Sequence, residues 1–301
     1  MRISTRSSFR SSLLAIQTAS QRLAELQTHL AEGRRIQKPS DGPLQAATSL
    51  AARHQVRSIE ASLRGIDRSR SYLEAQESIL GSMNEVFTDL ESLAHRGADD
   101  GLGGASRKAL ALEVDAYIEE LVEMTNQTFG GVHVFSGTDS KTPSLAVERD
   151  AEGRIVSVNP SASPDAPRSF YLGDGAGLRL GVTAADAWGD QADVMQDMLA
   201  LRDRLLADDG EGVRGLLETM EAHGDRLRAQ QSVVGVQVNH LEKLEAHFLS
   251  TQVEAEATRS KAEDLDMAAA AIRWNQETAG LEATLTATSR LLNLNLLDFL
   301  R

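Results

Sequence analysis

Residues 267–300, with the sequence MAAAAIRWNQETAGLEATLTATSRLLNLNLLDFL, form the stretch that decides the fold. Residues recur in it at alternating steps of four and three, which puts one stripe along an α-helix and is the period of supercoiled helix pairs. The stripe consists of Met267, Ala271, Trp274, Thr278, Leu281, Leu285, Thr288, Leu292, Asn295 and Phe299. Between Leu291 and Leu300, apolar residues spread around the whole helix, and such a helix has to be covered on every side. We therefore expect several neighbouring helices, supplied by other molecules, to cover this end of the chain.

The composition favours long helices over a thick core. The chain has 301 residues, of which 41% are apolar but only 4% are aromatic. Because aromatic side chains bury the largest areas, we expect no large globular core, but helices that meet along narrow seams. The absence of cysteine excludes disulfides, thiolate zinc sites and cysteine nucleophiles. No apolar run approaches the ~20 residues of a membrane span, and we expect no membrane insertion.

The charge is unevenly distributed along the chain. The net charge is −13, yet residues 1–40 carry seven Lys or Arg against Glu25 and Glu32, a local net charge of +5. A protein that is acidic as a whole binds nucleic acid poorly. We therefore expect no nucleic-acid partner, and we expect the basic segment to contact acidic surfaces of other copies of the chain.

The six prolines leave room for very long helices. They fall within 39–43 and 143–167 only, so residues 44–142 and 168–301 can run as helices. Residues 5–32 predict a helix that Gly33 ends in the left-handed conformation. A second helix is predicted to about residue 96, with Ser40 or Asp41 as its N-cap. The stripe of the first helix consists of Phe9, Leu13, Ile16, Leu23 and Leu30, with Ser20 and Gln27 as polar interruptions.

The middle of the chain has a different residue pattern. Short alternating runs between Gly, Pro and Asp turn signals predict β structure between residues 130 and 185. The predicted fold is mainly α, with long antiparallel coiled-coil helices from both chain ends and a small β-rich insertion. The predicted domains are a terminal assembly domain of residues 1–40 and 265–301, a long-helix bundle of 41–140 and 186–264, and a β-rich outer domain of 141–185.

No pattern predicts a catalytic residue, a cofactor site or a metal site. His240 and His247 share a helix face but lie two turns apart, too far to share a metal without a ligand from another element. The glycines of 173–177 follow a strand as a phosphate loop would, but no G-K-[ST] follows them, which favours a β-turn. Trp274 belongs to a residue type that stacks on cofactors, yet an anchor in a helix seam is the commoner role. The sequence therefore predicts a structural protein without enzymatic activity.

Motifs from both ends of the chain resemble one family. Residues 33–43, GRRIQKPSDGP, are similar to the G-K-R-I-x-x-P-S-D-D-P segment of the flagellin-like axial proteins of bacterial flagella, with Gly42 in place of the second Asp. Residues 134–138, VFSGT, resemble the L-F-A-G-T turn of that family, and residues 264–268 and 294–300 resemble its closing pattern. Within the family, the sequence is most similar to the hook-associated protein 3 group, the proteins of the hook–filament junction.

The resemblance implies a place in a helical assembly. In this family the two terminal arms pair as an inner layer lining a tube, the long helices form the next layer, and the insertion faces solvent. The chains are exported unfolded without a cleaved signal, which implies an extracellular location in the flagellum. The implied partners are copies of the chain itself, hook-associated protein 1 and flagellin, with an export chaperone as a further candidate. The predicted assembly interface consists of Phe9, Leu13, Ile16, Leu23, Leu30, Trp274, Leu281, Leu285, Leu292, Leu296 and Phe299.

Two alternative functions stay open at this point. One is a flagellin proper, which would polymerise into long filaments. The other is a cytoplasmic coiled-coil adapter, which would stay in the cell as a soluble oligomer.

Overall fold

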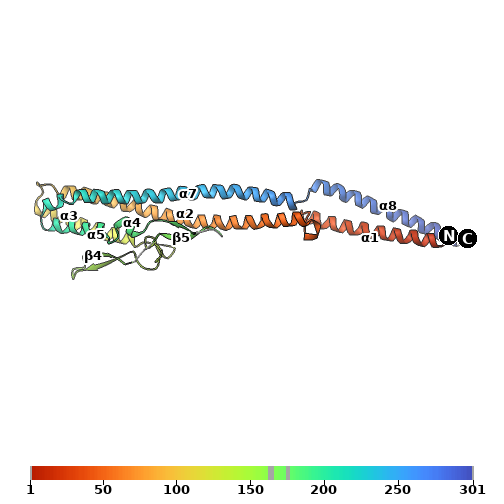
Figure 1. The fold of residues 1–301 in the computed structure, drawn as a ribbon, viewed down its shortest axis with the longest axis horizontal. Helices are drawn as coiled ribbons and strands as arrows, with labels where there is room; N and C mark the ends of the chain where they lie inside the picture. Colours follow the sequence, from red (N-terminus) through yellow and green to blue (C-terminus); the bar gives the residue numbers. More distant parts are fainter. Residues whose placement is uncertain (1, 162–165, 174–176, 300–301) are drawn as a thin grey trace. The chain divides into compact units, whose positions relative to one another are not determined.

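The chain folds mainly into long α-helices, as predicted (Figure 1). The computed structural model describes residues 2–161, 166–173 and 177–299, and within these ranges the side chains of residues 10–290. The helices are α1 (Arg2–Glu32), α2 (Pro43–Gly97), α3 (Gly104–Thr125), α4 (Ala184–Trp188), α5 (Asp193–Leu206), α6 (Gly210–Arg214), α7 (Leu217–Glu263) and α8 (Met267–Phe299). They belong to two compact units, one of Met1–Arg57 with Ser250–Arg301 and one of Ser58–Leu249. The three-part division derived from the prolines stays a prediction.

The first unit contains the two arms of the chain, α1 and α8. They lie side by side and run antiparallel, with the Arg2 end of α1 next to the Phe299 end of α8 (Figure 1). Arg22 Nη1 lies 3.8 Å from Glu277 Oε1, which shows that these two residues lie at the same level of the helix pair. Gly33 follows α1 with φ of +68°, so the predicted left-handed helix end is confirmed.

The break between α1 and α2 differs from the prediction in one detail. Residues Pro39–Asp41 form a short 3-10 turn, η1. Asp41 Oδ2 accepts hydrogen bonds from the backbone N–H groups of Lys38 (2.9 Å) and Gln37 (3.0 Å), and these bonds lower the pKa of Asp41. Asp41 therefore caps this turn rather than α2, whose first turn bonds back to the carbonyl of Gly42.

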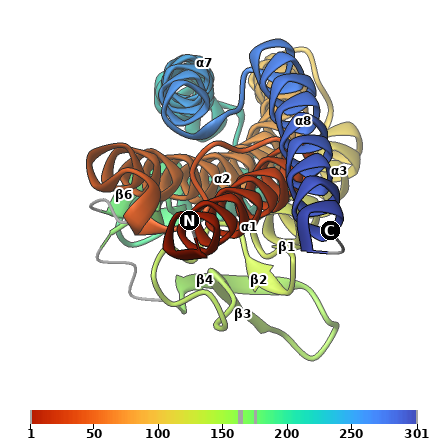
Figure 2. The same cartoon turned by 90° about the vertical axis from the view of Figure 1, so that its right-hand side faces the viewer.

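The second unit is built on an antiparallel pair formed by parts of α2 and α7. Arg70 Nη1 donates to Glu245 Oε2 at 2.6 Å, and Asn84 Nδ2 donates to Gln231 Oε1 at 2.8 Å. In both pairs the residue numbers sum to the same value, as expected for two helices that keep one antiparallel register over four turns. Helices α3 and α5 pack against each other (Figure 1), and the view along the helices shows α3 beside α2 (Figure 2).

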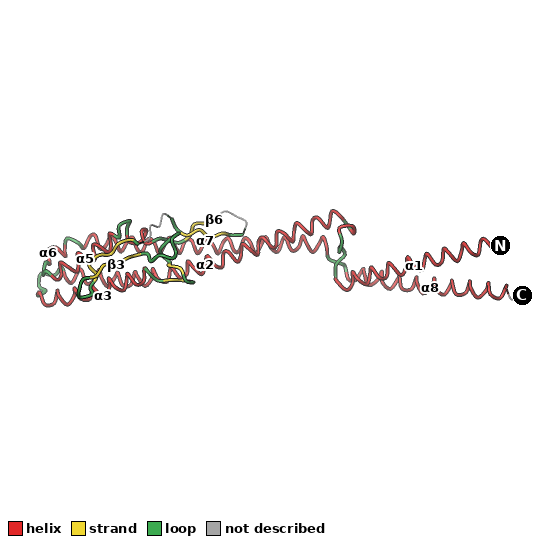
Figure 3. Tube along the Cα trace, turned by 90° about the horizontal axis from the view of Figure 1, so that it is seen from below, coloured by secondary structure: helices red, strands yellow, loops and turns green. Residues whose placement is uncertain are grey.

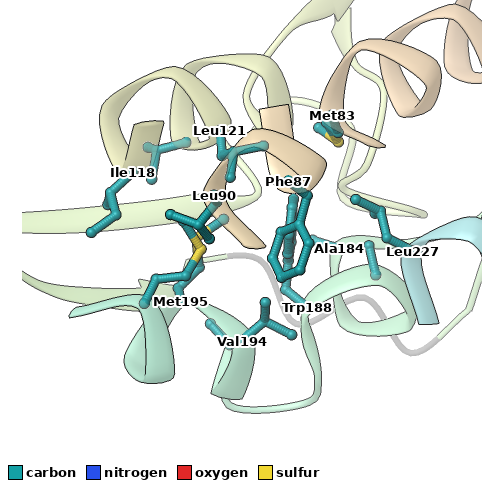
Figure 4. Close-up of a cluster of buried hydrophobic side chains, with 14 of the residues drawn as sticks. Met83, Phe87, Leu90, Ile118, Leu121, Ala184, Trp188, Val194, Met195 and Leu227 are labelled. Carbon is teal, nitrogen blue, oxygen red and sulfur yellow. The ribbon is translucent and has the colours of Figure 1, made fainter. Parts of the chain in front are cut away.

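A continuous apolar core fills the second unit, so the expectation of no sizeable core is wrong for this part of the chain. Phe87 of α2 packs with Trp188 of α4 and Met195 of α5, and all three are at most 1% exposed (Figure 4). Trp188 Nε1 donates to Thr125 Oγ1 at 2.9 Å, which satisfies the buried indole. The low aromatic content misled the prediction because Leu, Met and Val supply most of this core. The core contains no residue of α1 or α8 among the described side chains.

Among the described residues, three antiparallel hairpins occupy the middle of the sequence, as the alternating runs predicted (Figure 3). They are β1 (Thr128–Phe129) with β2 (Val132–His133), β3 (Leu145–Arg149) with β4 (Ile155–Pro160), and β5 (Arg168–Tyr171) with β6 (Gly177–Leu180). Gln76 of α2 ties the connecting segments to the helices: its Nε2 donates to Val182 O at 2.7 Å and its Oε1 accepts from Val182 N at 2.9 Å. Burial raises the pKa of Tyr72 to about 12, so its hydroxyl stays protonated and donates to Val134 O at 2.6 Å.

Candidate assembly interface

The seam between α1 and α8 is shallow. Half-buried residues recur along α1 at steps of four and three: Ser12, Ile16, Ala19, Leu23, Leu26 and Leu30. The matching residues of α8 are Ala270, Trp274, Glu277, Leu281, Thr284 and Thr288. Among the described side chains of the two helices, Ala270 alone is buried, with 3% exposure. Each helix therefore covers only one flank of the other.

The predicted interface residues fall into three groups. Ile16, Leu23, Leu30, Trp274 and Leu281 lie half-buried on the seam. Two other predicted residues, Leu13 and Leu285, are 43% and 47% exposed and lie beside the seam. The side chains of the remaining four, Phe9, Leu292, Leu296 and Phe299, lie outside the described residues.

The seam is rotated by about one residue from the predicted stripe. The sequence prediction followed Ser20 and Gln27, which are exposed, and missed Ala19 and Leu26, which are half-buried. The alternative stripe could have been read from the sequence. Ile16, Leu23 and Leu30 belong to both patterns, but Ala19 and Leu26 are apolar where the predicted stripe has Ser20 and Gln27. That rotation leaves Leu13 outside the seam.

Several large apolar side chains of the two arms lie outside the seam and stay exposed. Leu14 is 59% exposed, Ile272 is 58% exposed and Met267 is 52% exposed, in addition to Leu13 and Leu285. The antiparallel register that sets Arg22 opposite Glu277 places Leu13 at the level of Leu285. Clusters of large exposed apolar residues on a soluble protein mark surfaces for other molecules. The arms thus offer apolar surface beyond the seam that joins them.

A polar groove of about 270 Å³ lies at one level of the arm pair. Arg22, Glu25 and His29 of α1 line it, together with Arg273 and Glu277 of α8. The ion pair between Arg22 and Glu277 is solvent-exposed and long, and such pairs contribute little to stability. Across the described parts of the chain, His, Asp and Glu form no cluster that could hold a metal ion.

A buried carboxylate lies where the two arms begin. Glu263, the last residue of α7, is 2% exposed. Its Oε2 accepts hydrogen bonds from Ser49 Oγ at 2.6 Å and from Arg53 Nε at 3.0 Å, and Arg53 Nη2 donates to the same oxygen. Its Oε1 lies 3.5 Å from Arg259 Nε and 3.9 Å from Arg34 Nε. Burial raises the pKa of Glu263, but the bonds from Ser49 and Arg53 and the nearby positive charges outweigh it and lower the pKa below its ordinary value.

Backbone hydrogen bonds reinforce this contact. Arg35 N donates to Glu263 O at 2.7 Å and Leu265 N donates to Gly33 O at 3.0 Å, so that Arg34 and Asp264 form an isolated antiparallel bridge. The sequence reasoning singled out 33–43 and 264–268 as separate motifs and missed that they meet. No local signal could have shown it, since 214 residues separate Ser49 from Glu263.

Comparisons with known proteins agree with this architecture. Residues 3–140 match the bacterial flagellin N-terminal helical region. The flagellar filament 30.7 kDa core protein of Treponema maltophilum is 21% identical over 240 residues, which are 79% of this chain and 78% of that protein.

Solved structures share the fold. A flagellar hook-associated protein of Vibrio parahaemolyticus has a TM-score of 0.63 at 17% identity, covering 74% of this chain and all of that one. FlgL of Bacillus cereus has a TM-score of 0.57 at 17% identity and covers 70% and 99%. The flagellar junction protein FlgL of Legionella pneumophila has a TM-score of 0.56 at 13% identity and covers 72% and 99%.

The fold is that of the flagellin-like axial proteins, since the N-terminal match and the solved structures agree on it. The solved structures that share this fold also include a hook-associated protein 3 of Legionella pneumophila, with a TM-score of 0.58 at 14% identity. In the described residues, no helix is long and apolar enough to cross a membrane.

Proposed function

We propose that this chain is a structural protein of the bacterial flagellum that forms the junction between the hook side and the flagellin filament by helical self-assembly. Its working parts are the seam and the exposed apolar residues of the arms, rather than a catalytic site. In this role it makes contact with copies of itself, with a hook-side junction protein such as hook-associated protein 1, and with flagellin. An extracellular location, reached without a cleaved signal and with the help of an export chaperone, belongs to the same proposal.

The observation that carries the proposal is the incomplete cover of the arms. Over residues 10–32 and 267–290, Ala270 is the one buried side chain, while Leu14 and Ile272 stay more than half exposed. A helix pair with so little buried surface gains little from its own packing, because hydrophobic stabilisation scales with the area removed from water. Other subunits can supply that area. A contact in which one surface meets a different surface of the next copy repeats without closing and builds a helical array.

A filament subunit is the second candidate, and one observation favours it. The curated relative from Treponema maltophilum is a flagellar filament core protein. The two candidates differ in whether the purified chain grows without limit. Seeded with flagellar fragments and viewed by electron microscopy, a filament subunit elongates into long fibres, whereas a junction protein adds a short segment and stops.

Deletion of the gene tests the preferred function directly. Cells without this chain should keep their hooks, lose their filaments and release unassembled flagellin into the medium. Re-expression of the wild-type chain should restore filaments. Cells that still carry full filaments after the deletion would rule out the junction role. Cells that lose their filaments but release no flagellin into the medium would point to the filament subunit instead.

A further inference from the structure

The joint around Glu263 couples the two arms of one molecule before any neighbour arrives. We infer that Glu263 is a positioning residue that locks the break after α1 to the turn before α8 and thereby sets the register in which the arms pair. The inference concerns the isolated chain. Its consequence for assembly rests on the proposed function.

The contacts around Glu263 join three separate segments of the first unit. Ser49 and Arg53 come from the first turns of α2, Arg34 from the break after α1, and Arg259 from the end of α7. A carboxylate that is 2% exposed is stable only when such partners replace the water it has lost. Loss of the α2 segment would remove Ser49 and Arg53, which donate hydrogen bonds to Oε2, and loss of the break after α1 would remove the positive charge of Arg34 near Oε1. The carboxylate is therefore best compensated when all three segments are in place.

The joint around Glu263, or lock, is specific for the register of the two arms because it includes backbone hydrogen bonds. Arg35 donates to Glu263 and Leu265 donates to Gly33, which aligns one residue of the break with one residue of the turn, Arg34 with Asp264. A further bond runs from Arg35 Nη2 to Ala262 O at 3.1 Å. A slip of the chain by one residue would break all of these bonds at once.

Both arms start within a few residues of the lock, so the lock determines how they face each other. Gly33 ends α1, and Asp266 Oδ1 accepts from Ala269 N at 3.0 Å to cap the start of α8. Arg22 lies twelve residues before Arg34 and its partner Glu277 lies thirteen residues after Asp264. At ~1.5 Å per residue, the lengths of α1 and α8 between the lock and this ion pair are about equal.

The seam alone is a weak guide to register. It contains Ser12, Thr284 and Thr288 among its half-buried positions, and of its side chains within 10–32 and 267–290 it buries only Ala270. Heptad patterns with few large apolar residues pair in more than one register, since specificity in coiled coils comes from particular packing or polar contacts. The charged, buried contact at Glu263 is such a polar contact, placed at the end of the pair instead of inside it.

Spin labels on the arms of the purified chain test the inference. The wild-type sequence has no cysteine, so Gln17→Cys and Glu282→Cys, both at exposed positions, give one label on each arm. The label-to-label distance distribution is measured in the parent, in Glu263→Gln, and in the matched control Glu254→Gln, which changes an exposed carboxylate on the same helix. Amide exchange at Arg35 and Leu265 is measured alongside.

The inference requires a single narrow distance in the parent and in Glu254→Gln, and a broad distribution in Glu263→Gln. Exchange at the amides of Arg35 and Leu265 should become about tenfold faster or more in Glu263→Gln, since loss of the charged side-chain contacts lets the backbone bonds beside them open more often. A parent that is already broad, or a Glu263→Gln variant as narrow as the parent, overturns the inference. If Glu263→Gln also unfolds the second unit, Ser49→Ala decides: it must broaden the distribution while the second unit stays folded, and an unchanged distribution overturns the inference.

Because this measurement uses the purified chain without partners, its failure leaves the junction role untouched. Conversely, a chain that fails to join a flagellum can still pass it.

Discussion

Leu14→Asp should separate folding of the chain from its assembly. Leu14 is 59% exposed in the isolated chain, so the substitution removes little that the monomer uses. Exposed substitutions of this kind typically change the free energy of unfolding by no more than ~0.5 kcal/mol. Helix content and the thermal midpoint of the monomer should therefore match those of the wild type.

The expected loss in assembly follows from the same exposure. Full burial of a leucine contributes ~1.5–3 kcal/mol, so the exposed 59% leaves ~1–2 kcal/mol to be gained against a neighbour. That is a factor of roughly 5–30 in each contact. A carboxylate in the same place must also be desolvated, which adds to the loss, and every copy in a ring carries the substitution.

The assay compares Leu14→Asp with Leu112→Asp, an equally simple change at a leucine of α3 that is 68% exposed. Circular dichroism and thermal melting report on the monomers, and rescue of filaments in the deletion strain reports on assembly. Leu112→Asp should rescue filaments and Leu14→Asp should not. The reasoning fails if Leu14→Asp lowers the melting temperature of the monomer, or if both variants rescue equally well.

Four further changes test other parts of the structure. Leu292→Asp should leave the soluble monomer folded and block assembly; equal losses of helix signal and of thermal stability in the monomer would contradict this. Burial raises the pKa of Glu91, so the fold loses stability as the pH rises through the raised pKa and the carboxyl becomes charged. Glu91→Gln should therefore melt at a higher temperature than the wild type at pH 7, and the two should melt alike in acid, where Glu91 is protonated. Gln76→Leu strands buried carbonyl and amide groups and should cost the second unit ~1–3 kcal/mol in denaturant unfolding, whereas an unchanged midpoint would mean that these groups find other partners. The pKa of Glu263 is lowered, so its contribution is complete above the ordinary value of 4.5 and disappears as pH falls through the lowered one; proteolysis at residues 33–42 should accelerate there in the wild type and show no such step in Glu263→Gln.

Local signals in the sequence predicted the helices well. Gly33 ends α1 with a positive φ, and α2 begins at Pro43. Both signals could be read from the sequence because a left-handed cap and a proline in the first turn affect only the backbone of the few residues next to them. The alternating runs around Ile155 and Phe170 became strands for the same reason, since the period of side-chain exposure is local.

Contacts between distant segments could not be predicted in this way. Whether the seam follows Gln27 or Leu26 depends on what the other helix presents, and the two stripes differ by only one residue. Glu263 is an ordinary Glu at the end of a polar helix until Ser49 and Arg53 are brought to it. The apolar core of the second unit was missed because Leu, Met and Val fill it without the aromatic residues that usually announce a core.

The combination of weakly packed arms and a strongly bonded joint has a physical logic. Binding between molecules costs entropy when it has to order segments that are disordered in the free molecule. A surface whose helices are already aligned therefore binds more tightly for the same contacts. Arms that were fully packed on each other would leave no apolar surface for a neighbour, while arms without a fixed register would present a different surface each time. Fixing the register at Glu263 and leaving Leu14 and Ile272 uncovered satisfies both requirements. The strong polar contact therefore belongs at the base of the arms, and the uncovered apolar surface belongs along them.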